Sequence, residues 1–304
     1  MRISTNMIFN QGITSIQQQE ANLVQTQLQL SSGLSVMTPA DNPVAAAEAV
    51  NLQQTMAVTQ QYTQTNASSA TSSLQLEDNV LGSVTTTLQQ IQNAVVQAGD
   101  GSLSSANLQN LGAEVQGYAQ NLLSLANSSA ENGQYMFAGY KGSNPPFVAQ
   151  TNGNVTYQGD SGQQLVQAST SRQIPVSDPG NTLFSTDASG NVTLFDQLNT
   201  FQKALASGTT SSGSVNVNSM LNTLQSAMTQ VLQVRASVGS RLQELSAVQA
   251  TGQSQGLQYQ TDISNLTSLD YAKAISNFTE QQTYLQAADK SYSQVTQLSL
   301  FSYI

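Results

Sequence analysis

The C-terminal stretch of the chain, Leu269–Ile304, carries a narrow apolar stripe that it cannot bury by itself. At helical spacing its apolar side chains fall on one side of a helix, and Gln282 and Ala288 fill the remaining positions of the row. The stripe consists of Ile275, Phe278, Leu285, Tyr292, Val295 and Leu298. An isolated helix flanked by Gln, Ser, Asn and Thr draws little stability from propensity alone. This stretch therefore requires a partner helix.

The first 34 residues offer that partner. Apolar residues recur there at spacings of three and four, interrupted by Glu20 and Gln27. They are Ile13, Ile16, Leu23, Leu30 and Leu34. One helix is predicted from about Ile3 to Leu34, ending where Gly33 can adopt the left-handed conformation of a C-cap. We therefore expect the two ends of the chain to be neighbours in space.

The surface of this protein is polar but weakly charged. Asp, Glu, Lys and Arg make up 8% of the residues, against about 25% in an ordinary soluble protein. Beyond the net charge of −9, little self-repulsion opposes close packing of copies. The eight basic residues are scattered singly, so neither nucleic acid nor an anionic membrane is an expected partner.

The chain has no His, Cys or Trp, so it can form neither a disulfide framework nor a thiolate metal site. The N-terminal residues lack the charged and apolar regions of a cleaved signal peptide, and no run reaches the roughly 18 apolar residues of a spanning helix. If the protein leaves the cell, export without a cleaved signal is expected.

Two more helices are predicted in the first half. Asn42-Pro43 is a good start signal for a helix that runs to about Ala98, and a further helix spans about Ser104–Ser129. Their regular apolar positions are Leu74, Leu81, Val84, Leu88, Ile91 and Val95, then Leu108, Leu111, Val115, Tyr118, Leu122 and Leu125.

The helical spacing returns in the second half. Its positions are Leu221, Leu224, Met228, Val231, Arg235, Val238, Leu242 and Leu245. The charged Arg235 either reaches solvent or pairs with a carboxylate such as Glu77 or Glu114. A break is expected near Thr267, where Ser268 could cap the terminal helix.

Between these halves, Gly, Pro, Asn and Asp become frequent and short β-prone runs alternate with turn signals. The runs are 135–137, 147–148, 155–157, 164–166, 174–176 and 191–194, followed by a short helix at 196–206 and a flexible linker at 208–214. The predicted fold is mainly α with an inserted β domain. Three parts are expected: paired terminal helices at 1–35 and 268–304, a helical bundle at 36–131 and 207–267, and a β-rich insert at 132–206.

The candidates for chemistry are weak. The stretch Gly252–Gly256 matches the Gly-x-Ser-x-Gly nucleophile pattern, but it lies in a helical run and the chain has no His to activate the serine. The turns at Asp160–Gly162 and Asp187–Asn191 lack the later glutamate of a calcium loop. The adjacent Glu77 and Asp78 fall on different helix sides and are expected to be solvated. We expect no catalytic, cofactor-binding or metal-binding residues.

The apolar stripes of the internal helices most simply form the core of one subunit. The terminal helices have no third element predicted beside them, and two thin helices make a marginal core. The expected assembly interface between subunits is therefore Ile13, Ile16, Leu23, Leu30, Leu34, Ile275, Phe278, Leu285, Tyr292, Val295 and Leu298.

Several motifs resemble the flagellin family. They are Met1–Asn6, Ser31–Leu34, Pro39–Ala47, Asn132–Tyr140, Pro145–Phe147, Val155–Asp160 and Gln297–Ile304. The terminal motifs are shared across that family, whereas the middle ones resemble its members at the hook-filament junction. One departure is Asn42, where an acidic residue is more usual, and Asn caps a helix equally well.

The resemblance implies a structural subunit of the bacterial flagellum, outside the cell. Its implied partners are copies of itself in a ring, hook-associated protein 1, flagellin, and a cytoplasmic export chaperone that binds near the C-terminus. It also implies type III export in an unfolded state. Two alternatives remain open: a flagellin-like filament subunit, and an extracellular adhesin-type module whose residues 139–205 bind a ligand alone.

Overall fold

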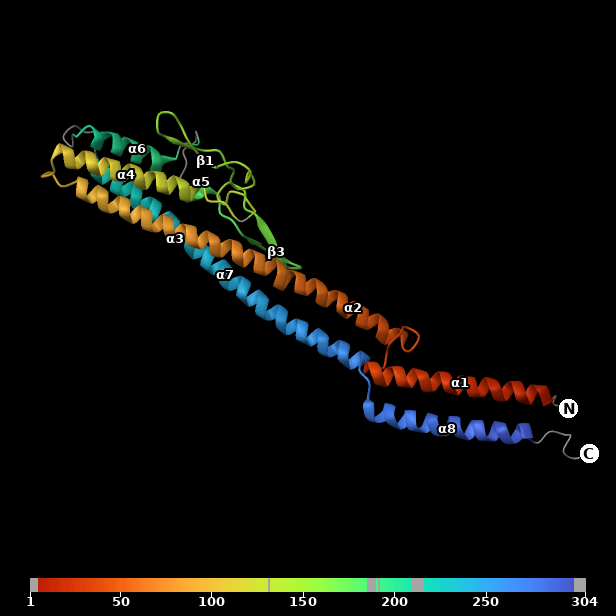
Figure 1. The fold of residues 1–304 in the computed structure, drawn as a ribbon. Coiled ribbons are helices and arrows are strands. Elements are labelled where there is room, and N and C mark those ends of the chain that lie inside the picture. Colours follow the sequence, from red (N-terminus) through yellow and green to blue (C-terminus); the bar gives the residue numbers. More distant parts are fainter. Residues whose placement is uncertain (1–4, 131, 185–189, 191, 209–215, 298–304) are drawn as a thin grey trace, which may run out of the picture. The chain divides into compact units, whose positions relative to one another are not determined.

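The computed structural model describes residues 5–130, 132–184, 190, 192–208 and 216–297, and within them it is mostly helical, as the sequence predicts. The helices are α1 (Thr5–Ser32), α2 (Pro43–Gln60), α3 (Ala67–Ala98), α4 (Ser105–Ala126), α5 (Gly180–Leu183), α6 (Thr193–Ala206), α7 (Val217–Thr267) and α8 (Tyr271–Gln297), with a π-helix at Gln61–Asn66 (Figure 1). The strands are β1 (Phe147–Ala149), β2 (Val155–Tyr157), β3 (Leu165–Ser169) and β4 (Arg172–Pro175).

The chain forms two compact units. One comprises residues 1–58 and 255–304, and the other residues 59–254. The first holds the paired terminal helices, and the second holds the main hydrophobic core and all four strands. The finer division into terminal helices, bundle and insert stays a prediction.

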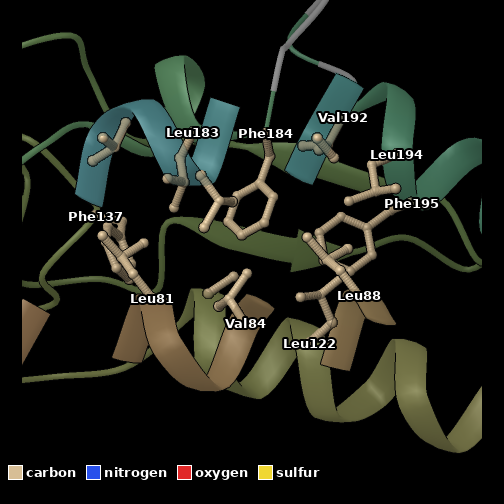
Figure 2. Packing of buried hydrophobic residues seen from close by; sticks show 14 of the residues in the cluster. Leu81, Val84, Leu88, Leu122, Phe137, Leu183, Phe184, Val192, Leu194 and Phe195 are labelled. Atoms are coloured by element: carbon tan, nitrogen blue, oxygen red, sulfur yellow. The ribbon is translucent and has the colours of Figure 1, made fainter. Parts of the chain in front are cut away.

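The core of residues 59–254 is built where the predicted apolar positions of α3 and α4 meet α6, α7 and the segment between α4 and α6. All six predicted positions of α3 are fully buried, and four of the six on α4 are buried. An aromatic cluster of Phe147, Phe184 and Phe195 covers them, with ring centroids 5.4–6.4 Å apart. Figure 2 shows Phe184 and Phe195 lying over Val84, Leu88 and Leu122.

The predicted helix from Asn42 to Ala98 is interrupted by the π-helix. Its start is as expected, since the Asn42 side chain accepts a hydrogen bond from the Ala45 amide at 3.1 Å. Within the π-helix, Thr63 packs so closely on Gly252 of α7 that no side chain would fit there. The π-helix also meets β3, where the Asn66 side-chain Nδ2 donates a hydrogen bond to the Gln167 backbone carbonyl at 2.9 Å. π-Bulges mark such special contacts, and spacing alone does not reveal them.

The strands form two antiparallel hairpins, β1–β2 and β3–β4. Phe147 pairs with Tyr157 in the first, and Leu165 pairs with Pro175 in the second. Two other predicted strands are wrong: Tyr135 makes only an isolated bridge to Ser129, and residues from Thr193 onward begin helix α6. The predicted linker at 208–214 lies outside the described residues from 209 onward.

The row of α7 residues that faces the core, which we call its seam, is displaced by one residue from part of the predicted apolar positions. The positions that face the core at spacings of four and three are Met220, Leu224, Ala227, Val231, Val234, Val238, Arg241, Leu245, Val248 and Gly252. Arg241, instead of Arg235, is therefore the charged seam residue. Arg235 lies at the edge and pairs with a carboxylate, as the two open alternatives allowed, but the partner is Asp78, with Nε 2.9 Å from Oδ1, and not Glu77 or Glu114.

Glu77 is not solvated either. It occupies a seam position of α3 between the buried Leu74 and Leu81, and only 1% of its surface is exposed. The expectation failed because adjacency to Asp78 puts the two carboxylates on different sides of the helix without saying which side faces the core.

The contact between Gly252 and Thr63 gives a direct test of how the helices pack. The substitution Gly252→Ala is expected to destabilise the protein by about 1–3 kcal/mol, because the added methyl group overlaps the Thr63 side chain. Thermal unfolding followed by circular dichroism measures the change. The matched control is Gly239→Ala on the same helix, where the methyl group has open space and should stabilise by up to about 1 kcal/mol. Equal changes in stability at both positions would contradict the close contact between Gly252 and Thr63.

Candidate assembly interface

In the structure, α1 and α8 lie side by side and run antiparallel within one unit (Figure 1). Their contact follows the 3,4 spacing of a coiled-coil seam. At spacings of three and four, the less exposed positions are Phe9, Gly12, Ile16, Gln19, Leu23, Thr26 and Leu30 on α1, and Gly33 just after it; on α8 they are Ala274, Phe278, Gln281, Leu285, Ala288 and Tyr292. We call these positions the terminal seam.

The structure divides the predicted interface residues into two groups. Ile16, Leu23, Leu30, Phe278, Leu285 and Tyr292 are half-buried in the terminal seam. Ile13, Leu34 and Ile275 are exposed, at 42%, 40% and 54%. The seam uses Gly12 beside Ile13, and it uses Ala274 and Gln281 where the spacing suggested Ile275 and Gln282. The Val295 side chain and the whole of Leu298 lie outside the described part of the chain.

Small and polar residues let the two helices approach. Tyr292 packs edge-on against Phe9, with ring centroids 6.1 Å apart, and its ring lies over Gly12. Further along, the Thr26 hydroxyl donates to the Gln281 side-chain oxygen at 2.9 Å. Thr26 and Ala274 are the most buried residues of the described terminal seam, at 8% and 5% exposure. A seam that remains mostly half-exposed cannot hold the pair together strongly.

A backbone connection fastens the pair at one end. The Leu269 amide donates to the Gly33 carbonyl at 3.0 Å, and the Ser35 amide donates to the Thr267 carbonyl at 2.7 Å. Gly33 ends α1 with a φ of 73°, which confirms the predicted left-handed cap. Because Ser268 takes part in this bridge, it does not cap α8; the Asp270 carboxylate does so, accepting from the Lys273 amide at 3.1 Å.

The loop between α1 and α2 is organised by one carboxylate. Asp41 accepts hydrogen bonds from the backbone amides of Thr38 and Met37, at 2.8 and 3.0 Å. These bonds lower the pKa of Asp41 below its usual range, because they favour the charged form. The Gln25 side chain also donates to Asp41 at 2.7 Å, which ties the loop to α1.

A second apolar stripe lies on α1 outside the terminal seam. It consists of Ile13, Val24 and Leu28, which are 42%, 53% and 49% exposed. At about 100° per residue these three side chains fall within roughly 60° of one another. We call them the outer stripe of α1. No other described element of the same unit buries them, so α1 presents apolar surface on two sides.

The described residues lend no support to the candidate nucleophile and metal motifs of the sequence. Gly252–Gly256 lies entirely within helix α7, where no strand precedes the serine. Asp160 is a turn residue whose carboxylate accepts from the Tyr140 and Gly162 amides, and of the turn at 187–191 only Gly190 is described. Within the described ranges no cluster of three or more acidic groups could hold a metal, and no helix is long and apolar enough to cross a membrane.

The helical termini match known families. Residues 3–142 match the bacterial flagellin N-terminal helical region, and residues 221–304 match the bacterial flagellin C-terminal helical region. Flagellar hook-associated protein 3 of Salmonella typhimurium is 35% identical over 99% of both chains, and that of Escherichia coli is 33% identical over 99% of both. This chain belongs to the flagellin family of flagellar structural proteins, in its hook-associated protein 3 branch.

Solved structures share the fold. A putative flagellar hook-associated protein from Vibrio parahaemolyticus has a TM-score of 0.69 at 19% identity, covering 75% of this chain and 100% of its own. The flagellar junction protein FlgL from Legionella pneumophila has a TM-score of 0.61 at 19% identity, covering 73% of this chain and 100% of its own.

The cap at Gly33 provides a test of the connection between the terminal helices. The substitution Gly33→Ala should weaken the backbone connection between α1 and α8 by about 1–2 kcal/mol, because a side chain disfavours the positive φ. Hydrogen exchange of the Leu269 and Ser35 amides measures the loss.

The added methyl group would also lie 2.7 Å from the Tyr271 hydroxyl oxygen. Comparing Gly33→Ala in the native and Tyr271→Phe backgrounds separates this crowding from the backbone strain. Unchanged protection of both amides in both backgrounds would show that the cap does not hold α1 and α8 together.

Proposed function

We propose that this chain is a structural subunit of the bacterial flagellum that forms the junction ring between hook-associated protein 1 and the flagellin filament. The proposal draws on the match to hook-associated protein 3 over nearly the whole chain. It also draws on the terminal helices, whose apolar residues exceed what the pair can bury.

The outer stripe of α1 is the observation that carries the proposal. Ile13, Val24 and Leu28 remain exposed after α1 has paired with α8. On α8, Ile275 and Tyr284 are 54% and 55% exposed. Such apolar surface on a pair of long helices fits packing against the same helices of neighbouring subunits. The eleven predicted interface residues, together with Val24 and Leu28, form the proposed contact.

The proposed partners are those that the resemblance to the flagellin family implies. Copies of the chain would pack laterally in the ring, with hook-associated protein 1 on one side and flagellin on the other. The half-exposed terminal seam separates at small cost, which suits export in an unfolded state through the flagellar type III apparatus. It also leaves α8 available to a cytoplasmic chaperone near the C-terminus before export.

The chain's relatives favour the junction over the two alternatives. The 35% and 33% identical proteins are both named hook-associated protein 3, and the match includes the middle of the chain. A strain that lacks this gene distinguishes a junction protein from a filament subunit. Loss of a junction protein should leave hooks intact and release unpolymerised flagellin into the medium. An adhesin-type role would require that residues 139–205 alone bind a ligand.

Deleting residues 269–304 should leave a soluble protein that cannot join a filament. The core of residues 59–254 contains none of the deleted residues, so its thermal midpoint should stay within a few degrees. Circular dichroism measures the fold, and electron microscopy of complemented cells measures filament assembly. Normal filaments on the truncated protein would refute the assembly role.

A single charge in the terminal seam gives a milder test. Phe278→Asp places a carboxylate at a half-buried seam position, which should weaken incorporation into filaments severely. The matched control is Asn277→Asp, which adds the same charge at an exposed neighbouring position and should assemble normally. Neither variant should change the unfolding free energy of the internal core by more than about 0.5 kcal/mol. Equal assembly defects in the two variants would mean that net charge, and not the seam, matters.

A further inference from the structure

Three ionisable side chains meet inside the unit formed by residues 59–254. Glu77 and Arg241 occupy seam positions of α3 and α7, and Asp178 comes from the segment after β4. The Arg241 guanidinium binds Asp178 through both of its terminal nitrogens, with Nη1–Oδ2 at 2.9 Å and Nη2–Oδ1 at 3.0 Å. The Gln163 side chain adds a donor to Asp178 at 2.8 Å. The charge of Asp178 is therefore already balanced without Glu77.

Glu77 holds the same segment from the other side. Its Oε1 accepts a hydrogen bond from the Asp178 backbone amide at 3.1 Å. Its Oε2 is buried and has no hydrogen-bond partner among the described residues. A buried, ionised carboxylate with one unsatisfied oxygen, beside a second carboxylate, is costly, whereas a neutral acid is not.

A small cavity borders this side chain. Its volume is about 70 Å³, and its lining includes Glu77, Gln134, Tyr135, Gln164 and Ser177. That volume suffices for one or two water molecules. A protonated Glu77 can use its hydroxyl as a donor towards such polar neighbours, which an ionised Glu77 cannot do.

We propose that Glu77 is a buried proton-binding site, and that its neutral carboxyl group fastens the β3–β4 hairpin and the segment around Asp178 to helix α3. When the proton leaves to water or to a buffer base, the group becomes a second negative charge beside Asp178. The attachment then weakens. The site lies wholly within residues 59–254 and does not depend on the role proposed for the terminal helices.

The electrostatic surroundings agree with this assignment. Burial, and then the Asp178 carboxylate, raise the pKa of Glu77 to about 8, while the Asp178 amide and Arg241 act in the opposite direction. Two further pairs of charged groups in the described chain are Asp78 with Arg235, and Glu244 of α7 with Arg172 of β4. Tyr135 is the titratable residue on the cavity wall in the described segment 132–136.

The sign of the pH effect follows from linkage. An unfolded Glu77 releases its proton near its ordinary pKa of 4.5, and the folded one does so near 8. Between these values the folded state binds more protons, so stability falls as the pH rises through this window and becomes independent of Glu77 above it. The variant Glu77→Gln retains an oxygen for the Asp178 amide and cannot ionise, so it should lack this decline.

The decisive experiment measures the pKa of Glu77 by NMR. The full chain labelled with ¹³C at the side-chain carboxyl carbon of its seven glutamates is titrated by NMR from pH 4 to pH 9. We expect one resonance, absent from Glu77→Gln, to titrate with a midpoint near 8. In the native protein the Asp178 amide resonance should follow the same midpoint, which identifies the group without any variant. A Glu77 midpoint below pH 6 would overturn the proposal.

Hydrogen exchange tests the attachment itself. After correction for intrinsic exchange rates, the β3–β4 amides of the native chain should lose protection as the pH rises from 6.5 to about 8, by up to roughly tenfold for each pH unit, and should lose no more above that pH. The Glu77→Gln protein should not lose protection in this range. Glu131→Gln is run in parallel, because residue 131 lies between two cavity-lining residues in sequence and outside the described ranges. If Glu77 titrates near 8 and the β3–β4 amides keep their protection, Glu77 does not fasten the hairpin. If the loss of protection persists in Glu77→Gln and disappears in Glu131→Gln, the titrating group is Glu131 and not Glu77.

Discussion

A narrow stripe of apolar side chains on a long helix must be covered from more than one side, and the whole structure depends on how each helix meets that requirement. In residues 59–254 the stripes of α3, α4, α6 and α7 contribute to one core, and the aromatic side chains of the inserted segment close it. Most of the seam residues there are completely buried. The terminal helices meet the same requirement with only one partner each, and most of their seam stays half-exposed.

The chemistry of the two kinds of seam differs as much as their burial. The internal seams are rich in Leu, Val and Ile, whereas the terminal seam includes Gly12, Gln19, Thr26 and Gln281. The Gln19 side-chain oxygen is buried and has no hydrogen-bond partner in the described chain. Such a seam specifies the register of the pair through the Thr26–Gln281 hydrogen bond but adds little hydrophobic stabilisation. The terminal pair is therefore weakly held, but its register is defined.

The spacing of apolar residues predicted which segments are helical and that the two ends meet, but it did not predict the phase of every seam. On α7, Leu221, Met228 and Leu242 lie beside the buried positions, because apolar residues occupy both the seam and its flank. On α8 the small Ala274 enters the seam and the larger Ile275 stays outside, since closely packed helices favour small residues between them. Spacing gives large side chains the most weight, so it selected Ile275.

Short-range signals were less informative in the middle of the chain. Of the β-prone residues 191–194, Val192 caps α6 and the next two begin it, because the segment packs as a helix against α4. The π-helix and the contact between Thr63 and Gly252 could not be predicted, as they depend on which helix lies opposite. The available signal was Gly252 itself, because a glycine in a helical run lets another element approach closely.

Charged residues at seam positions are the feature that spacing could have revealed. Glu77 continues the series of Leu74, Leu81 and Val84 at intervals of three and four, and Arg241 continues the series of Val234, Val238 and Leu245. A chain with so few charges places two of them where apolar side chains would stabilise the core more. Their partner Asp178 lies in the inserted segment, so these polar groups determine where that segment attaches to the helices. Because Arg241 and Asp178 neutralise each other, the protonation of Glu77 decides whether the cluster carries an unbalanced charge, and this makes the attachment of the insert, unlike the rest of the core, sensitive to pH.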